Sequence, residues 1–198
     1  MLNLLFRIID ATEIGLPLGF YTSQWFANFY MQTVDHFIKE KLGAKYYIRY
    51  MDDMVIFGAN KKELHRTRDS IAVYLWHELG LEMKENWQVY RFSYIKDGKE
   101  HGRDLDFMGF RFYRNRTVLR RNIMLKSTRK AKKLSKKDKA TIYDIRQMMS
   151  YLGWLDYTDT YEMYEERIKP YANIQYFERR LSRYDKRRLR EVGNGNHL

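Results

Sequence analysis

The sequence predicts an α+β fold in which an antiparallel sheet backed by helices comes first and an all-helical part follows. Apolar residues recur at helical spacing in two long segments of the first half, and short β-rich runs bounded by turn residues lie beside them. Glycine is absent from residues 125–152 and proline from residues 125–169, where helical periodicity continues. We therefore expect the architecture to change near residues 122–126.

The first half of the chain predicts two helices separated by a hairpin. Residues 22–42 have apolar side chains at helical spacing, with Thr22 or Ser23 as the N-cap and Gly43 as the stop. Residues 45–50 and 54–57 are short and β-rich, so they predict a hairpin with Met51, Asp52 and Asp53 at its tip. Residues 61–79 predict a second helix, which ends at Gly80.

A β-rich section and then helices are expected in the second half. The pattern predicts strands over residues 87–95, 106–113 and 117–121, with turns at 96–98 and 114–116 and a bulge at Gly109. Beyond it, a single helical face is expected to hold several apolar side chains: Ile142, Ile145, Met148, Met149 and Leu152.

The composition indicates a folded, strongly basic protein. The chain has 198 residues, of which 44% are apolar, and its 37 Lys and Arg against 25 Asp and Glu give a net charge of +12. This surplus favours a polyanionic partner, although charge alone leaves nucleic acid, an acidic membrane surface and an acidic protein open. Without cysteine the chain suits a reducing compartment, and no apolar run approaches membrane-spanning length, so we expect a cytoplasmic protein without a membrane partner.

The basic residues are concentrated in two segments of the second half. Residues 111–139 contain 13 Lys and Arg against one acidic residue, Asp138. A second cluster spans residues 179–190, and the tail at 193–198 is expected to be disordered. Either run could be a solvated helix face, or it could bind nucleic-acid phosphates.

The two adjacent aspartates at the hairpin tip are the strongest chemical signal. Asp52 and Asp53 follow one β-rich run and precede another, where carboxylates are costly unless they are paired. Oxygen ligands of this kind suit Mg²⁺, and two such ions can activate a 3′-hydroxyl and stabilise a leaving pyrophosphate. Because Asp is also a common turn residue, the dipeptide alone leaves both interpretations open.

The other candidate features are weaker when taken singly. The Gly/Pro loop at residues 15–24 opens a helix, where backbone N–H groups can meet a phosphate, although it could equally be an ordinary loop. Lys84 alone is an ordinary surface lysine. The five histidines lack metal-binding spacing, and the sequence contains neither a nucleophilic triad order nor a Walker-type phosphate loop.

The order of these features is more specific than any one of them. GLPLGFYTSQ opening a helix, YIRYMDD on a hairpin, Lys84 after the next helix, DFMGF and a basic helical region together resemble the reverse transcriptases, from the palm to the thumb, over residues 10–170. TSQWFANFYMQTVDHFIKE and YYIRYMDDMVIF are similar to bacterial enzymes of diversity-generating retroelements and, more distantly, of group II introns and retrons. SYLGW at residues 150–154 looks like the thumb helix of that group.

The resemblance implies a domain organisation and a set of partners. Residues 1–123 would be a palm portion, 124–192 a helical thumb and 193–198 a disordered tail. The enzyme would bind an RNA template, a DNA primer and deoxynucleoside triphosphates, with two Mg²⁺ ions or Mn²⁺ as cofactors. An accessory protein of the retroelement is a further expected partner.

The resemblance also implies a role for individual residues. Asp52 and Asp53 would be the catalytic pair and the metal ligands. The expected nucleotide- and template-binding residues are Gly15, Pro17, Leu18, Gly19, Ser23, Gln24 and Lys84. The expected primer-binding residues are Tyr50, Met51, Phe107, Met108, Gly109 and Phe110. The expected contacts to the nucleic-acid backbone are Arg129, Lys130, Lys132, Lys133 and Lys136. Within diversity-generating retroelements a branched apolar residue at this position is associated with low copying fidelity, so Leu18 is compatible with error-prone copying.

One departure from the family pattern concerns a third catalytic aspartate. The resemblance places that aspartate and the fingers upstream of the GLPLG loop, yet only 14 residues precede Gly15, and Asp10 has the context of a structural residue. We therefore expect a C-terminal palm and thumb portion that is inactive alone. An exposed sheet edge and an uncovered apolar patch would favour self-association.

Two other interpretations remain. A non-catalytic RNA-binding module, as in maturase-like remnants, would keep the fold and lose the chemistry. A basic protein that binds an acidic partner by charge alone would show no preference for an RNA/DNA hybrid. The intact YMDD tip favours polymerase ancestry, because a scaffold has no obvious need for adjacent acids there.

Overall fold

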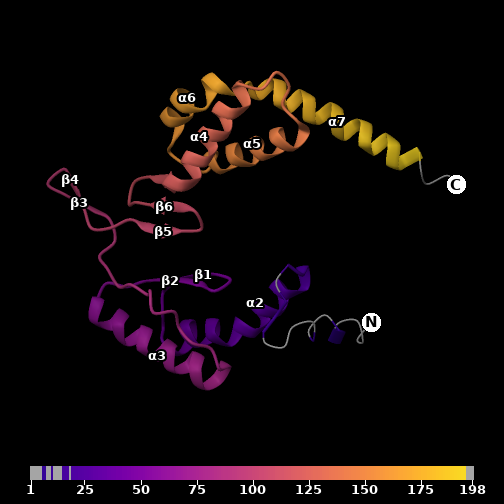
Figure 1. The fold of residues 1–198 in the computed structure, drawn as a ribbon. Helices are drawn as coiled ribbons and strands as arrows, with labels where there is room; N and C mark the ends of the chain where they lie inside the picture. Colours follow the sequence, from indigo (N-terminus) through magenta and orange to yellow (C-terminus); the bar gives the residue numbers. More distant parts are fainter. Residues whose placement is uncertain (1–5, 8–9, 11–14, 18, 195–198) are drawn as a thin grey trace. The chain divides into compact units, whose positions relative to one another are not determined.

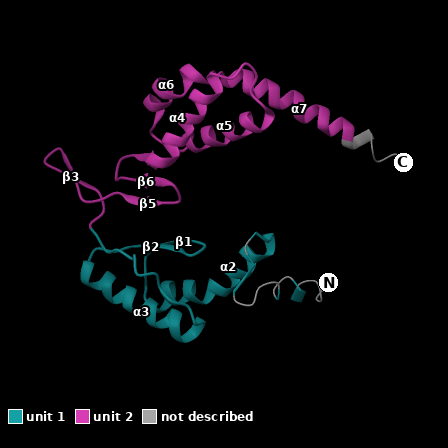
Figure 2. Ribbon diagram, viewed as in Figure 1, with its two compact units in different colours: residues 1–90 teal, residues 91–198 magenta. Residues whose placement is uncertain are grey.

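The chain folds into two compact units, as seen in a computed structural model that describes residues 6–7, 10, 15–17 and 19–194 (Figure 1). Unit 1 comprises residues 1–90 and unit 2 residues 91–198 (Figure 2). Both units combine helices with small antiparallel sheets, which confirms the α+β prediction. Within the described residues, no helix is long and apolar enough to span a membrane.

In the described part of unit 1, helices α2 and α3 support one hairpin. Helix α2 (Tyr21–His36) continues into the π-helix η1 (Phe37–Lys41), strands β1 (Tyr46–Tyr50) and β2 (Asp53–Phe57) form the hairpin, and helix α3 (Lys61–Leu79) follows. The buried core joins the two helices and is extended by partly buried side chains of the hairpin. Its fully enclosed residues are Val34, Ile38, Ile71 and Leu75.

The start of α2 differs from the prediction. Neither Thr22 nor Ser23 is the N-cap: the helix begins at Tyr21 after Phe20, and no side chain caps it. Ser23 Oγ instead donates a hydrogen bond of 2.6 Å to the carbonyl oxygen of Pro17, so this hydroxyl holds the preceding loop rather than the helix N–H groups.

Helix α3 has the predicted bounds because local capping determines both its ends. The Asn60 side chain accepts a hydrogen bond from the Lys62 N–H at the start, and Gly80 ends the helix with φ +62 and a left-handed backbone. Gly43, with φ +63, likewise follows the end of η1, as predicted for the first helix. The helix termini of unit 1 were thus predictable apart from the α2 cap.

Unit 2 begins with two small sheets. Strands β3 (Tyr94–Lys96) and β4 (Lys99–His101) form a hairpin around Asp97 and Gly98, as predicted for the turn. Strands β5 (Leu105–Phe107), β6 (Phe110–Phe112) and β7 (Thr117–Leu119) form a three-stranded antiparallel sheet. The single antiparallel sheet predicted for the first part of the chain is wrong, since the described strands form three separate sheets.

Two strand predictions in this region were also wrong. The strand predicted over residues 87–95 begins only at Tyr94. Before it, residues 87–93 form only an isolated bridge, between Phe92 and Arg103. The expected strand over 106–113 is a hairpin that turns at Met108 and Gly109 instead of bulging there. Both turn residues have left-handed backbones, with φ +52 and φ +86, and this conformation reverses the chain.

Helices complete unit 2. Helices α4 (Arg121–Ser135), α5 (Ile142–Leu155), α6 (Tyr161–Arg167) and α7 (Ile174–Asn194), with the 3₁₀ helix η2 (Lys169–Tyr171), surround a second core. Ile145, Met148 and Leu152 of α5 are buried in it, as their helical spacing predicted. The expected tail is described only to Asn194, where α7 ends, and its last residues lie outside the described part of the chain.

The sheet of β5–β7 packs with the helices of unit 2. The Phe110 and Trp154 rings lie 5.1 Å apart between centroids, and the Thr117 N–H donates to Asp159 Oδ2 at 2.8 Å. This is why the compact units divide between Tyr90 and Arg91, whereas the expected functional division lies between residues 123 and 124. The strands before α4 therefore share a folding unit with the helices after it.

Helix α5 is joined to α4 by a buried carboxylate. Asp144 accepts hydrogen bonds from Lys130 Nζ at 2.8 Å and Lys137 Nζ at 2.5 Å, and it forms a capping box with Thr141. These hydrogen bonds, that from Lys130 first, hold the pKa of the Asp144 carboxyl well below its usual range. Folding of the unit therefore stabilises the ionised form of the Asp144 carboxyl.

Replacing Gly109 should destabilise unit 2 more than replacing another left-handed glycine. A Cβ at position 109 would lie 2.6 Å from Trp154 Cζ3 and 2.9 Å from Ile123 Cδ1, whereas none of the neighbouring atoms lies within 4 Å at Gly98. We expect Gly109→Ala to cost about 2 kcal/mol or more, and Gly98→Ala about 1 kcal/mol for the backbone alone. Urea unfolding followed by circular dichroism measures both, and equal losses would contradict the packing argument.

Removing the Asp144 charge should lower the melting temperature in a pH-dependent way. Because the folded-state pKa is depressed, its stabilisation is present above the unfolded value, near pH ~4, and is lost as the pH falls further. We expect Asp144→Asn to melt about 5 °C or more below wild type at neutral pH. This difference in melting temperature should become smaller in acid, because the wild-type carboxylate is then protonated as well. The exposed pair of Asp185 and Arg146 provides the control, Asp185→Asn, which should change little. A gap that is independent of pH would refute the assignment.

Candidate active site

The turn of the first hairpin presents the two adjacent aspartates. Tyr50 pairs with Asp53 at the end of the β1–β2 register, so Met51 and Asp52 alone form the turn. Asp53 is therefore the first residue of β2, and the prediction that it lies in the tip between the strands was wrong. Both carboxylates are exposed, and Met51 has φ +55, which is unusual for a residue with a side chain. The turn thus holds two oxygen-donor groups at the surface of unit 1.

Lys84 lies against the first of these carboxylates. Its Nζ is 2.6 Å from Asp52 Oδ2, although 32 residues separate the two in sequence. This hydrogen bond lowers the pKa of Asp52 and raises the pKa of Lys84. Because both side chains are more than two-thirds exposed, the pair adds little to stability. It leaves an ammonium group beside the carboxylate that could move to a bound anion.

The end of α3 positions Lys84. The Tyr30 hydroxyl of α2 donates a 2.6 Å hydrogen bond to the Leu79 carbonyl, and Gly80 then turns the chain away from the helix. Leu81 N–H returns to the Leu75 carbonyl at 3.0 Å, which completes the turn. The segment that carries Lys84 is therefore directed by both helices of unit 1.

A network that the sequence did not predict supports the turn from below. The Arg49 guanidinium of β1 donates to both oxygens of Asp35, to Asn28 Oδ1 and to the Met51 carbonyl. Burial opposes ionisation of Asp35, but the hydrogen bonds from Arg49 and Tyr47 outweigh it and lower its pKa. The available sequence signal was an arginine within a β-rich run, on the strand that leads into the two aspartates.

The glycine-rich loop lies at the start of the same helix. Gly15 and Gly19 have left-handed backbones, with φ +74 and +92, and Pro17 is buried and held by Ser23. Gln24 is exposed on the first turn of α2. Leu18 falls outside the described residues. The loop is thus joined to α2, the helix whose residues Asn28 and Asp35 contact Arg49.

The predicted primer-binding residues belong to both units. Tyr50 and Met51 lie at the turn of the first hairpin in unit 1, where Tyr50 is exposed. Residues 107–110 form the β5–β6 turn of unit 2, in which Met108 is 41% exposed and Gly109 packs against Trp154. Each group is well defined within its own unit.

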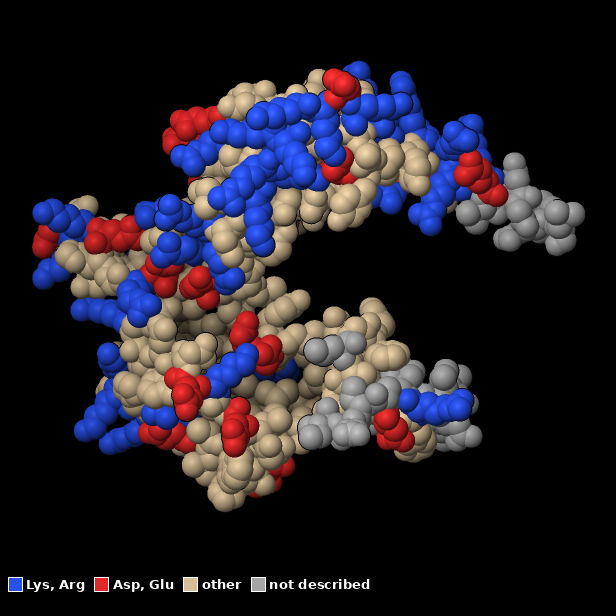
Figure 3. All heavy atoms as spheres, in the orientation of Figure 1, with Lys and Arg blue, Asp and Glu red and all other residues tan. Residues whose placement is uncertain are grey.

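The basic side chains of α4 divide into exposed and internal ones. Arg129, Lys132 and Lys133 of α4 and Lys136 just after it are exposed, and Figure 3 shows Lys and Arg gathered over the helices of unit 2. Lys130 differs from them, since its side chain is 13% exposed and its ammonium is bound to Asp144. The exposed residues can contact phosphates, whereas the geometry of Lys130 is that of a structural ion pair.

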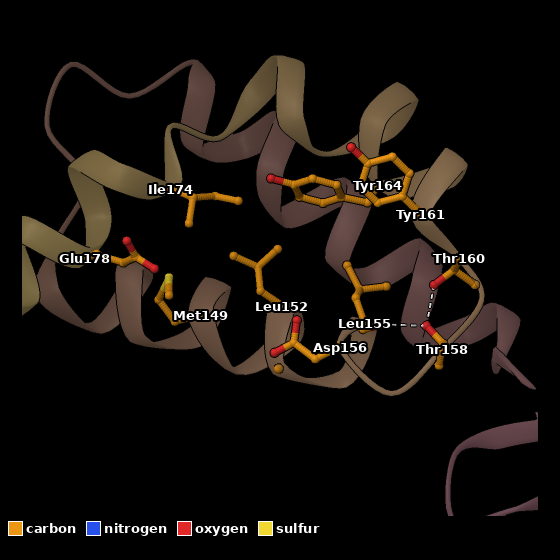
Figure 4. A pocket seen from close by; sticks show the side chains of 11 residues that line it. Met149, Leu152, Leu155, Asp156, Thr158, Thr160, Tyr161, Tyr164, Ile174 and Glu178 are labelled. Carbon is orange, nitrogen blue, oxygen red and sulfur yellow. Dashed lines mark hydrogen bonds between the residues drawn. The ribbon is translucent and has the colours of Figure 1, made fainter.

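A cavity in unit 2 lies apart from all the predicted site residues. It has a volume of about 470 Å³ between α5, α6 and α7, and Figure 4 shows Leu152, Leu155 and Ile174 around it, with Tyr161 and Tyr164 along one side. Across the described residues, no group of three or more His, Asp or Glu side chains could hold a metal ion. The pair at the hairpin turn therefore remains the best chemical candidate, and it offers two carboxylate ligands.

Comparison with known proteins supports the same assignment. The family model described as reverse transcriptase (RNA-dependent DNA polymerase) matches residues 9–153, well over half of the chain. No curated protein matches the chain. The match includes the glycine-rich loop, the aspartate turn, Lys84, the β5–β6 turn, helix α4 and most of α5, and it ends within α5. The chain belongs to the reverse transcriptase family.

Proposed function

We propose that this chain is the palm and thumb portion of a bacterial RNA-directed DNA polymerase, which copies an RNA template into DNA in the cytoplasm. The observation that carries the proposal is the turn at Met51 and Asp52, where two exposed carboxylates stand together beside the Lys84 ammonium. Family membership supports the activity class. Similarity of the motifs to diversity-generating retroelements supports a retroelement origin, with an accessory protein as a further partner.

The donor groups at the turn suit a hard divalent cation. Asp52 and Asp53 supply carboxylate oxygens, which Mg²⁺ and Mn²⁺ accept together with water and substrate phosphates. When bound, two such ions lower the pKa of the primer 3′-hydroxyl and stabilise the leaving pyrophosphate. Asp52, with its pKa already below the usual range, is ionised and ready to act as a ligand throughout the physiological pH range.

The residues around the pair have complementary roles in this proposal. Lys84 neutralises Asp52 and can transfer its hydrogen bond to the triphosphate of the incoming nucleotide, because its long side chain is exposed. The loop at residues 15–19, Ser23 and Gln24 line the nucleotide and template site. In unit 1, Met51 is the proposed primer contact. In unit 2, the 107–110 turn is a separate proposed primer contact, and the exposed basic residues of α4 bind the phosphates of the hybrid.

We also propose that a further carboxylate completes the site. Two-metal catalysis relies on carboxylates shared between the ions, and among the described residues Asp52 and Asp53 have no third acidic partner in a cluster of metal-ligand type. The third ligand would come from a part of the polymerase outside the described residues. Exposed aromatic side chains on α2, at Tyr21, Trp25 and Phe29, are compatible with association of unit 1 with such a part or with a second copy.

A non-catalytic RNA-binding module is the second candidate. Among the described residues Asp52 and Asp53 lack a third acidic partner, and the basic residues of α4 are exposed; both features are compatible with a family member that keeps the fold and binds RNA without copying it. The two functions differ in whether the aspartate turn binds a divalent cation.

Replacing Asp52 should weaken cation binding without changing stability. We expect Asp52→Asn to weaken Mn²⁺ binding more than about 10-fold, since a carboxylate ligand is lost. Titration followed by electron paramagnetic resonance measures this directly. Asp69→Asn is the matched control, because Asp69 is an exposed aspartate of α3 in the same unit. Equal Mn²⁺ affinity in wild type and Asp52→Asn would favour the RNA-binding module.

Primer extension on an RNA template tests the completeness of the site. Because the described residues bring only two carboxylates together at the turn, we expect this chain to extend a DNA primer little or not at all in Mg²⁺, while it still binds the hybrid. Vigorous extension that Asp52→Asn reduces by more than about 100-fold would confirm a polymerase and refute the need for an outside carboxylate. Extension that survives in Asp52→Asn would overturn the assignment of the catalytic pair.

Reversing two charges on α4 should weaken hybrid binding and its dependence on salt. The binding constant falls with salt, and each lost phosphate contact reduces the magnitude of the slope of log K against log salt by about 0.9. Lys132→Glu with Lys133→Glu should therefore reduce that magnitude by about 2. Lys61→Glu with Lys62→Glu makes the same charge change on exposed residues of unit 1. Fluorescence anisotropy with an RNA/DNA hybrid measures both variants, and equal losses would mean that only net charge matters.

A further inference from the structure

In strand β1 an apolar side chain is exposed and a charged side chain is mostly buried, which is the reverse of the usual arrangement. Ile48, the apolar residue at its centre, is 55% exposed, whereas the side chain of the neighbouring Arg49 is only 10% exposed. Successive residues of a strand point to opposite faces, so Arg49 faces α2 and Ile48 faces away from it. Burying a guanidinium costs free energy unless its N–H groups are bound. The strand would be expected to adopt this orientation only if Arg49 has a specific task.

The contacts of Arg49 engage every nitrogen of its guanidinium. Nε and Nη2 donate to the two oxygens of Asp35 at 2.7 and 2.6 Å, which is the bidentate geometry of a strong ion pair. Nη1 donates to Asn28 Oδ1 at 3.1 Å and to the Met51 carbonyl oxygen at 2.9 Å. Asn28 and Asp35 both belong to α2, so one side chain connects that helix to the turn.

The accepting carbonyl belongs to the strained residue of the turn. Met51 has φ +55, a conformation that costs a residue with a Cβ about 1–2 kcal/mol. Such a backbone persists only where surrounding contacts hold it. The peptide whose carbonyl Arg49 binds also contains the N–H of Asp52. The hydrogen bond therefore acts on the link between the strained residue and the first carboxylate.

We propose that Arg49 is a positioning residue of the active site, which fixes the direction of the Asp52 and Asp53 carboxylates by holding the Met51 peptide against α2. The proposal rests on the proposed function for its catalytic consequence. The same helix begins at the loop that Ser23 holds through Pro17. Arg49 therefore connects the turn to α2, the helix that follows the predicted nucleotide-binding loop. Both parts of the site are thus held by the same helix.

A lysine at this position cannot replace the arginine. Its single ammonium keeps the charge and can meet Asp35, but it lacks the planar fork that reaches Asp35, Asn28 and the Met51 carbonyl together. Arg49→Lys therefore removes the positioning contact while it retains an ion pair. Tyr47→Phe is the matched control, because it removes a 2.7 Å hydrogen bond to the same Asp35 and leaves every Arg49 donor in place.

Backbone ¹⁵N relaxation of the full chain tests the proposal. In Arg49→Lys we expect the order parameters of Met51 and Asp52 to fall from a rigid value of about 0.85 to below about 0.6, while those of β1 and β2 away from the turn stay unchanged. In Tyr47→Phe the turn should remain rigid even if the melting temperature falls. A loosened turn in both variants, or a rigid turn in Arg49→Lys, would overturn the proposal.

Titration with Mn²⁺ alone separates this inference from the proposed function. If the turn is a metal site, Arg49→Lys should weaken Mn²⁺ binding about 10-fold or more, and Tyr47→Phe should not. If wild type itself fails to bind Mn²⁺, the proposed function fails, while the relaxation data still decide whether Arg49 positions the turn. Undiminished Mn²⁺ affinity in Arg49→Lys, with binding by wild type, would overturn the positioning role.

Discussion

The ion pair between Asp35 and Arg49 is the contact on which the candidate site depends. A two-stranded hairpin is marginally stable by itself, and its turn would be mobile if only the strand ladder held it. Here a buried guanidinium joins the hairpin to α2 through two charge-assisted hydrogen bonds and extends a third to the turn. Val34 of α2 and Ile38 of η1 belong to one buried core with Ile71 and Leu75 of α3, so the turn is supported by the core of the unit.

This arrangement explains how an exposed pair of carboxylates can be both accessible and ordered. The carboxylates of Asp52 and Asp53 face solvent, where a cation and a triphosphate can reach them, while the groups that hold their backbone lie beneath the turn. Lys84, which follows the C-terminal end of α3, forms an ion pair with Asp52 and leaves the carboxylate exposed. Arg49, on the buried side of the hairpin, holds the backbone of the turn, and the exposed side presents the two carboxylates.

Unit 2 relies on a different kind of constraint. Its small sheet is joined to the helices by the close packing of Gly109 against Trp154 and by contacts between Thr117 and Asp159, while Asp144 joins α4 to α5. The buried side of α4 is therefore occupied by structural contacts, including that of Lys130. The remaining basic residues are on its outer surface, where phosphates could bind without disturbing the core.

The sequence by itself determined the local features of this protein. Capping at Asn60 and Gly80 set the bounds of α3, the Asp97–Gly98 pair set a hairpin turn, and the ordered motifs identified the family and the two aspartates. Each of these signals depends on neighbouring residues, so it can be recognised along the chain. The misplaced strand at 87–95 and the bulge expected at Gly109 show where such local signals become ambiguous.

Only the tertiary structure decided which residues meet across long separations. The inward orientation of Arg49 needs Asp35, 14 residues earlier, as its partner, and Lys84 reaches Asp52 across 32 residues. Trp154 and Ile123 leave no room for a side chain at the Gly109 turn, and Lys130 is internal because Asp144 lies beside it. A residue's burial and charge partner depend on how elements pack, and periodicity along the chain does not contain that information.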